Sequence, residues 1–204
     1  MDVHKICDVI KPIFDKYQNE EFVEMEFRLG KFNGSFFDVD VGIQNYNKIL
    51  QGLKMYSGWE KVISSKMEVY YRDSDNLRIS IDENTDETIN VKKERIHTEN
   101  FNNLKNTPYD VRFSVSKEIP LGENFECDGD MDKKKMKERV SFVRKNLSID
   151  VTKCTGGTDD IDEENESTYQ IEFEIVVPKN LKNIDELFNI IYKLSLIHIS
   201  EPTR

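Results

Sequence analysis

The chain has 204 residues, of which 37% are hydrophobic and 33% charged, so its length suits one domain and its composition is not that of a disordered segment. Acidic residues outnumber basic residues by 39 to 29, and this net charge of −10 argues against a protein that grips a long nucleic acid by its phosphates. The excess of acidic residues does not exclude a site that binds one end of a phosphate chain, because a few basic residues close to that site are enough.

The first predicted element is a helix over Val3–Tyr17, because apolar residues recur there at helical spacing. Pro12 interrupts this pattern, so we expect a kink or a late start. A strand with alternating side chains follows over Phe22–Leu29. A second helical pattern then covers Ile43–Tyr56.

The centre of the chain carries the period-two alternation that is typical of strands. The seven segments that show it are Met67–Arg72, Leu77–Asp82, Thr88–Arg95, Tyr109–Glu118, Met136–Val143, Leu147–Lys153 and Tyr169–Val177. A third helical pattern covers Ile184–Leu194, and Asn183 and Glu186 predict a capping arrangement at its start. Eight strands against three helices predict an antiparallel α+β fold.

Two segments near the end of the chain depart from this pattern. Asp159–Glu166 is an acidic, low-complexity run. Ser195–Arg204 breaks the helical pattern abruptly and can be a non-native addition, so it stays outside the functional argument. The expected organisation is one domain over residues 1–194 and a tail over residues 195–204.

Charged residues gather on one face of several predicted strands. The first strand places Glu24, Glu26 and Arg28 on one face, and the last strand does the same with Gln170, Glu172 and Glu174. The strands between them carry cations at alternate positions, namely Lys93 and Arg95, Arg112, and Lys135, Lys137 and Arg139. A single strand of this kind is most simply part of a half-solvated sheet. If the sheet closes into a barrel, however, these faces line one lumen and the helices can cover its apolar outside.

Such a lumen suits a metal ion and a phosphate chain. Carboxylates two residues apart on a strand lie on one face, roughly 6–7 Å apart at about 3.3 Å per residue, so their oxygens can converge on one cation. Ligation by oxygen alone favours Mg²⁺ or Mn²⁺. Lysine and arginine side chains in the same lumen can bind phosphate oxygens.

Five segments in order resemble the motifs of the triphosphate tunnel metalloenzymes. Glu24–Gly30 is similar to the ExExR/K strand of that superfamily. The other four segments are Tyr109–Glu118, Lys135–Phe142, Ser148–Lys153 and Gln170–Glu174, which resemble its central strand, its strand of alternating cations, its DxT strand and its closing ExE strand. Within the superfamily the chain is most similar to the metal-dependent RNA 5′-triphosphatases of fungi, protozoa and viruses, including the N-terminal domain of large DNA virus mRNA capping enzymes.

The resemblance implies a closed antiparallel β-barrel of about eight strands with flanking amphipathic helices. It implies Mg²⁺ or Mn²⁺ as the cofactor, with Glu24, Glu26 and Glu174 as metal ligands. Glu118 and Glu172 would hold metal-bound water or orient the nucleophile. The implied phosphate contacts are Arg112, Lys137 and Arg139 as catalytic residues, with Arg78, Lys93 and Lys135 as substrate-binding residues. Asp150 and Thr152 would organise the lumen by hydrogen bonds.

The sequence departs from the pattern of the superfamily at two positions. Gln170 stands where a third acid is frequent, so the closing strand reads ExE. Lys135 stands where arginine is common, and a lysine cannot donate the two parallel hydrogen bonds that a guanidinium group gives to a phosphate. The register near Lys92 and Lys93 is open, because a shift of one residue reverses the inward face.

The implied reaction is hydrolysis of the γ-phosphate of triphosphate-ended RNA to diphosphate-ended RNA and phosphate, the first step of mRNA capping. The implied partners are the 5′-triphosphate end of RNA, free nucleoside triphosphates and a linked or associated guanylyltransferase domain. A tunnel enzyme for small triphosphates or polyphosphate is one alternative, which the acidic loops leave open. A non-catalytic phosphate-binding tunnel is another, against which the intact acids argue, and an unrelated sandwich of alternating strands is a third.

Other routes to phosphate chemistry are absent from the sequence. A cysteine phosphatase needs an arginine six residues after its cysteine, and the positions in question hold Ile13, Lys133 and Asp160. No GxxxxGK[ST] loop and no KxDG motif occur. The three cysteines form no CxxC pair, and no apolar run of 18 residues or signal-peptide pattern is present. We therefore expect an intracellular protein of a reducing compartment with no membrane partner. If the protein is viral, we expect it in a cytoplasmic viral factory or a virion.

Overall fold

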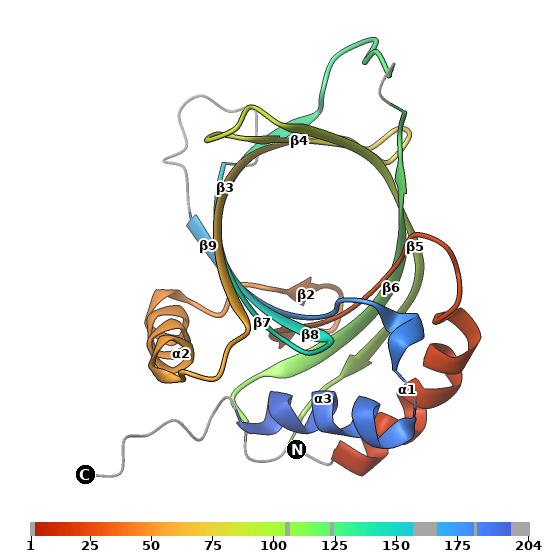
Figure 1. Cartoon of the computed structure of the whole chain (residues 1–204), viewed down its shortest axis with the longest axis vertical. Helices are drawn as coiled ribbons and strands as arrows, with labels where there is room; N and C mark the ends of the chain where they lie inside the picture. The colour runs from red at the N-terminus through yellow and green to blue at the C-terminus, as the bar shows by residue number, and fades with distance from the viewer. Residues whose placement is uncertain (1–2, 105–106, 123–124, 157–166, 182, 197–204) are drawn as a thin grey trace.

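Eight antiparallel strands of the described residues form a closed ring around a lumen, and one short strand extends the sheet (Figure 1). The computed structural model describes residues 3–104, 107–122, 125–156, 167–181 and 183–196. The strands are β1 (Val23–Phe32), β2 (Phe37–Asp38), β3 (Lys61–Arg72), β4 (Leu77–Asp82), β5 (Thr88–Phe101), β6 (Asp110–Pro120), β7 (Lys133–Arg144), β8 (Leu147–Thr155) and β9 (Ser167–Ile175). Their order is β2-β1-β6-β5-β4-β3-β7-β8-β9, and the additional pairing of β1 with β9 closes the barrel. The predicted fold class is confirmed.

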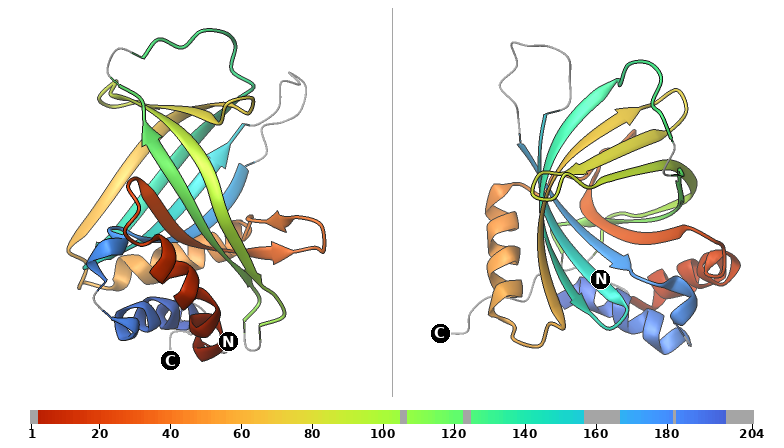
Figure 2. Two further views of the ribbon diagram at one scale, coloured as in Figure 1. Left: turned by 90° about the vertical axis from the view of Figure 1, so that its right-hand side faces the viewer. Right: turned by 45° about the horizontal axis from the view of Figure 1, so that its top comes forward.

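In the described residues, three α-helices cover parts of the outside of the barrel (Figure 2). Helices α1 (Val3–Tyr17) and α3 (Ile184–Leu196) pack together against one side, whereas α2 (Ile43–Met55) lies separately and contacts β9. A short 3-10 helix (Pro178–Asn180) follows β9. Within the described part of the chain, none of the helices combines the length and the apolar character that crossing a bilayer requires.

The hydrophobic core lies outside the lumen, between the barrel wall and the pair α1 and α3. The outward side chains Phe27 of β1 and Phe173 of β9 are fully buried, and they belong to the same cluster as Ile10 of α1 and Ile191 of α3. Full burial of side chains of this size stabilises the fold by about 1.5–3 kcal/mol each. Because the apolar faces pack outward against the helices, the charged faces of the strands line the lumen.

Several details differ from the sequence predictions. Helix α1 begins at Val3 and continues through Pro12, so the late start does not occur. Helix α3 continues to Leu196, and its predicted cap is confirmed because the Glu186 N–H donates to Asn183 Oδ1 at 3.0 Å. Strand β2 was not predicted. The acidic run at residues 159–166 and the tail at residues 197–204 lie outside the described residues.

Candidate active site inside the barrel

Closure of the barrel brings the acidic residues of its first and last strands side by side. In the β1–β9 pair, Glu26 lies opposite Glu174, and Arg28 lies opposite Glu172. Residues that face each other in an antiparallel pair share one side of the sheet, with Cα atoms about 4.5–5.5 Å apart. Glu24 lies on the same side of β1 as Glu26, so four carboxylates gather where these two strands meet.

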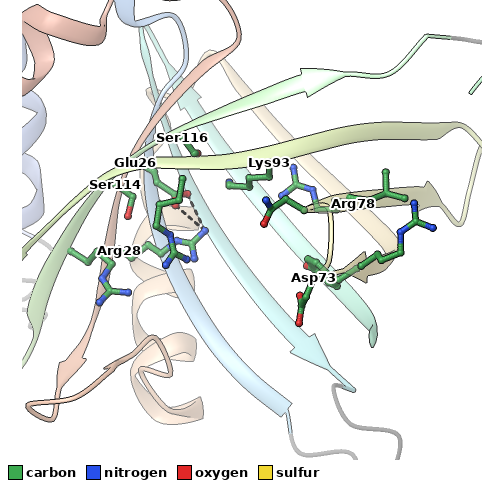
Figure 3. A pocket seen from close by; sticks show the side chains of 13 residues that line it. Glu26, Arg28, Asp73, Arg78, Lys93, Ser114 and Ser116 are labelled. Atoms are coloured by element: carbon green, nitrogen blue, oxygen red, sulfur yellow. Dashed lines mark hydrogen bonds and ion pairs between the residues drawn. The ribbon is translucent and has the colours of Figure 1, made fainter. Parts of the chain in front are cut away.

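A cavity of about 380 Å³ inside the barrel has more cationic than acidic side chains in its lining (Figure 3). The cationic lining residues are Arg28, Arg72, Arg78, Lys93, Arg95 and Arg112, and the acidic ones are Glu26 and Asp73. The whole chain carries a net charge of −10, so this part of the inner wall has the opposite sign to the molecule. A concave, cationic surface of this kind concentrates anionic ligands.

Glu172 is fixed by two guanidinium groups. Arg28 Nη2 lies 2.9 Å from Glu172 Oε1, and Arg139 Nη2 lies 3.0 Å from Glu172 Oε2. Burial would raise the pKa of Glu172, but Arg28 and Arg139 lower it to about 2. This carboxylate is therefore ionised and held in one orientation at neutral pH.

Glu118 is fixed in the same manner by two other cations. Its Oε1 lies 2.5 Å from Arg78 Nη2 and 2.9 Å from Lys93 Nζ. Burial would raise the pKa of Glu118, but Arg78 and Lys93 lower it to about 2. Lys93 also contacts Glu24, so Lys93 and not Lys92 faces the lumen, which resolves the open register.

Glu24 and Glu174 have the opposite electrostatic environment. Burial and the charge of Glu26 raise the pKa of Glu24 to about 7, in spite of its contact with Lys93. Burial and the charges of Glu24 and Asp150 raise the pKa of Glu174 to about 8. Among the described residues Glu174 has no ion-pair partner, so uncompensated negative charge collects here when both carboxylates ionise.

Glu24, Glu26 and Glu174 fit a divalent cation by their chemistry. They offer only oxygen ligands, which Mg²⁺ and Mn²⁺ prefer, and a cation would offset the repulsion that raises two of their pKa values. In the part of the chain that the structure describes, no three acidic, histidine or cysteine side chains already converge as metal ligands do. Glu26 points to Arg28 at 2.9 Å and Glu24 points to Lys93, so binding a cation requires these side chains to reorient.

Arg139 is held by residues of β8 as well as by Glu172. Its Nε donates to Thr152 Oγ1 at 3.0 Å, and its Nη1 donates to Asp150 Oδ2 at 3.1 Å. Asp150 also accepts a hydrogen bond from Ser148 Oγ at 2.6 Å. Asp150 and Thr152 are therefore both hydrogen-bonded to the guanidinium of Arg139.

Lys135 and Lys137 lie on the same inward face of β7 as Arg139. Lys137 Nζ is 5.8 Å from the centre of the Tyr71 ring, and Tyr71 lines the cavity. No ion pair of either lysine occurs among the described residues, so both can serve an anionic ligand. Gln170 lies inward on β9, where it places a neutral amide at the position of the third acid.

Some lumen residues had no role assigned from the sequence. Arg28 bridges Glu26 and Glu172, and the arginine of its motif was a signal for this position. Ser116 donates to Glu24 at 3.0 Å, and period-two alternation from Glu118 would have placed it inward. Arg95 lines the cavity on the same side of β5 as Lys93.

Comparisons with known proteins agree with this architecture. The family model described as "mRNA capping enzyme, beta chain" matches residues 41–190. The fold is similar to that of the Pct1 RNA triphosphatase of S. pombe, with a TM-score of 0.70 and 20% identity over 92% of this chain and 82% of that chain. It is also similar to the RNA triphosphatase domain of a trifunctional mimivirus mRNA capping enzyme, with a TM-score of 0.68 and 17% identity over 94% and 95% of the two chains. A search of the curated proteins gives no match.

Proposed function

We propose how this chain, which belongs to the mRNA capping enzyme beta chain family of RNA triphosphatases, carries out its reaction. Its barrel hydrolyses the γ-phosphate of triphosphate-ended RNA with a divalent cation held by Glu24, Glu26 and Glu174. The observation that carries this proposal is the pairing of Glu26 with Glu174 across β1 and β9, beside a cationic cavity. The family match begins at residue 41, after β1, so it does not include Glu24 and Glu26. These two acids are assigned to the site because β1 pairs with β9 in the closed barrel.

The chain's own cations would position the triphosphate. A bound Mg²⁺ or Mn²⁺ would neutralise charge on the phosphate oxygens. Arg139, Lys137 and Lys135 approach from β7, and Arg78 and Lys93 approach from β4 and β5. Phosphoryl transfer has a loose transition state, so positioning and charge stabilisation supply most of the catalysis.

Glu118 and Glu172 would orient the attacking water. A carboxylate whose pKa is about 2 is ionised at neutral pH but is a weak base, so it accepts a hydrogen bond more readily than a proton. A loose transition state places little demand on a base, which suits a group that only aligns water in line with the leaving oxygen. The products are diphosphate-ended RNA and phosphate.

The proposal extends to partners and location. Diphosphate-ended RNA is a substrate for guanylyl transfer, so we expect a guanylyltransferase in the same polypeptide or as a partner. The mimivirus relative is described as the triphosphatase domain of a trifunctional capping enzyme, which supports a linked arrangement. Cys7, Cys127 and Cys154 are all free, which supports a reducing, intracellular location. If the protein is viral, we expect a viral factory or virion. Free nucleoside triphosphates are a second expected substrate.

The test is phosphate release from triphosphate-ended RNA with Mn²⁺, with Mg²⁺ and with a chelator, beside ATP, thiamine triphosphate and tripolyphosphate. We expect release only with the metal, and an activity loss on the order of 100-fold or more in Glu24→Ala and Glu174→Ala. Urea unfolding of both variants should still show one cooperative transition. Near-normal turnover in either variant would refute the metal assignment, and a preference for tripolyphosphate over RNA would favour the alternative enzyme.

A further inference from the structure

Arg95 and Arg112 are the cavity cations whose charge no described carboxylate neutralises. The paired cations of the cavity are Arg28, Arg72, Arg78 and Lys93, each within 3.0 Å of a carboxylate oxygen. No ion pair of Arg95 or Arg112 occurs in the described residues. Arg95 is also exposed, although it lines the cavity, so its guanidinium is accessible to a ligand.

Within the described part of the chain, Arg112 is held in place by neutral groups. Its Nε donates to Asn100 Oδ1 at 2.8 Å, and its guanidinium carbon lies 4.6 Å from the centre of the Phe37 ring. These contacts fix the orientation of the guanidinium but leave its charge uncompensated. A cation that is fixed before binding loses little conformational freedom when an anion arrives.

The two arginines belong to one cationic cluster beside the carboxylates. Burial, followed by the charges of Arg95 and Arg28, lowers the pKa of Arg112, so the three guanidinium groups lie close enough to repel one another. Arg112 lies opposite Arg28 across β1 and β6, and Arg95 lies opposite Ser116 across β5 and β6. Ser116 in turn lies opposite Glu24, so the cluster borders the carboxylate site.

We propose that Arg95 and Arg112 form a second anion subsite, which binds the first phosphodiester of the RNA chain beyond the triphosphate. The inference rests on the proposed function, in which the carboxylates, Lys93 and Arg139 bind the triphosphate itself. It moves Arg112, which the resemblance implied as a triphosphate contact, to the RNA chain. A guanidinium fork can donate to two non-bridging oxygens of one phosphate, and this geometry suits a phosphodiester. ATP has no such phosphate, so the subsite favours RNA over free nucleoside triphosphates.

The substitution Arg95→Gln tests the subsite with two ligands, a triphosphate-ended tetranucleotide and ATP. The matched control is Arg144→Gln, which removes an exposed arginine that stacks on Tyr56 on the outside of the barrel. We expect Arg95→Gln to lower the ratio of kcat/KM for the tetranucleotide to kcat/KM for ATP at least tenfold. Arg144→Gln should leave this ratio as in the unaltered protein.

Binding in a chelator gives a second readout that does not need turnover. The plot of log Kd against log salt for the tetranucleotide should become less steep by about 0.7 in Arg95→Gln, because one phosphate contact to a single strand is lost. An equal loss for both ligands would overturn the inference, because Arg95 would then belong to the triphosphate site. Unchanged values for both would also overturn it. If the unaltered protein neither binds nor hydrolyses either ligand, the proposed function fails as well.

Discussion

At the scale of single residues, the inner wall holds two kinds of carboxylate. Glu118 and Glu172 are each paired with two cations, and their pKa values fall to about 2. Glu24 and Glu174 lie among other acids, and their pKa values rise to about 7 and about 8. The first kind is a fixed charge at neutral pH, whereas the second changes its ionisation near neutral pH and, in the proposed function, would exchange its proton for a metal ion.

The raised pKa of Glu174 predicts how stability depends on pH without metal. A carboxyl whose pKa is about 8 in the folded state and near 4.5 in the unfolded state stabilises the fold below pH 4.5, and this contribution is lost as the pH rises through 8. Glu174→Gln should therefore be more stable than the unaltered protein at pH 8.5 in a chelator, by on the order of 1–3 kcal/mol, since a pKa difference of one corresponds to about 1.4 kcal/mol. The two proteins should converge at pH 4.

Urea unfolding across this pH range measures the effect. The matched control is Glu87→Gln, which changes an exposed acid in the turn between β4 and β5. The control should follow the unaltered protein at every pH. A Glu174→Gln curve parallel to that of the unaltered protein would show that Glu174 is not under electrostatic strain.

Arg139 should affect stability with the opposite pH dependence. Its contact with Glu172 stabilises the fold above pH 4.5, and this contribution is lost as the pH falls toward 2. Arg139→Gln should lower the free energy of unfolding at pH 7 by about 2–4 kcal/mol, because it leaves Asp150 and Glu172 with fewer partners. The acid limb of its stability curve should be flatter than that of Arg144→Gln. An equally steep limb in both variants would contradict this account.

Much of the residue-scale arrangement follows from alternation, and the remainder needs three-dimensional contacts. Period two alone predicts that Glu24 and Glu26 share a face. It cannot decide between the adjacent lysines Lys92 and Lys93, since each fits one of the two phases. The uncompensated charge of Arg95 was also beyond prediction, because it depends on which carboxylates reach it across strands.

At the scale of elements, the short strand β2, which the sequence did not predict, packs beside the cavity and contacts one of its cations. It folds back on β1 so closely that a Cβ at Gly30 would lie 2.1 Å from the Asp38 backbone oxygen and 2.5 Å from Phe37 Cε1. Phe37 is the ring on which Arg112 stacks. The missing side chain at Gly30 therefore lets Phe37 lie where it contacts Arg112.

Gly30→Ala should displace β2 and release Arg112. We expect a loss of about 1–3 kcal/mol in the free energy of unfolding, the usual cost of an overpacked contact, and a reduced kcat/KM for triphosphate-ended RNA. Gly122→Ala is the control, since a Cβ there meets nothing within 4 Å. Urea unfolding and phosphate release measure both effects, and wild-type values for Gly30→Ala would disprove the support role of β2.

The elements themselves were predicted where their patterns are regular. Strand β5 extends six residues beyond its predicted end, because the register shift between Arg95 and His97 reverses the phase of the alternation. Strand β3 begins six residues before its predicted start, where Val62 and Ile63 are both exposed and show no alternation. Two-residue β2 is too short for any periodicity to reveal it.

At the scale of the whole molecule, barrel closure converts separate motifs into one site. The acids of β1 and β9 are about 150 residues apart in the chain, yet Glu26 and Glu174 are direct neighbours across the closing pair. The same closure gathers cations around a cavity inside the barrel, so an overall charge of −10 is compatible with an anionic substrate. The sequence motifs predicted this closure by resemblance, whereas the distances and pairings inside the barrel required the structure.

The most direct test of the shared cation is anomalous diffraction from crystals soaked in Mn²⁺. The account predicts one strong peak inside the barrel, with oxygens of Glu24, Glu26 and Glu174 at about 2.0–2.3 Å from the ion. The peak should vanish in Glu174→Ala crystals. A peak at another position, or one at this site that does not involve both β1 and β9, would contradict the account.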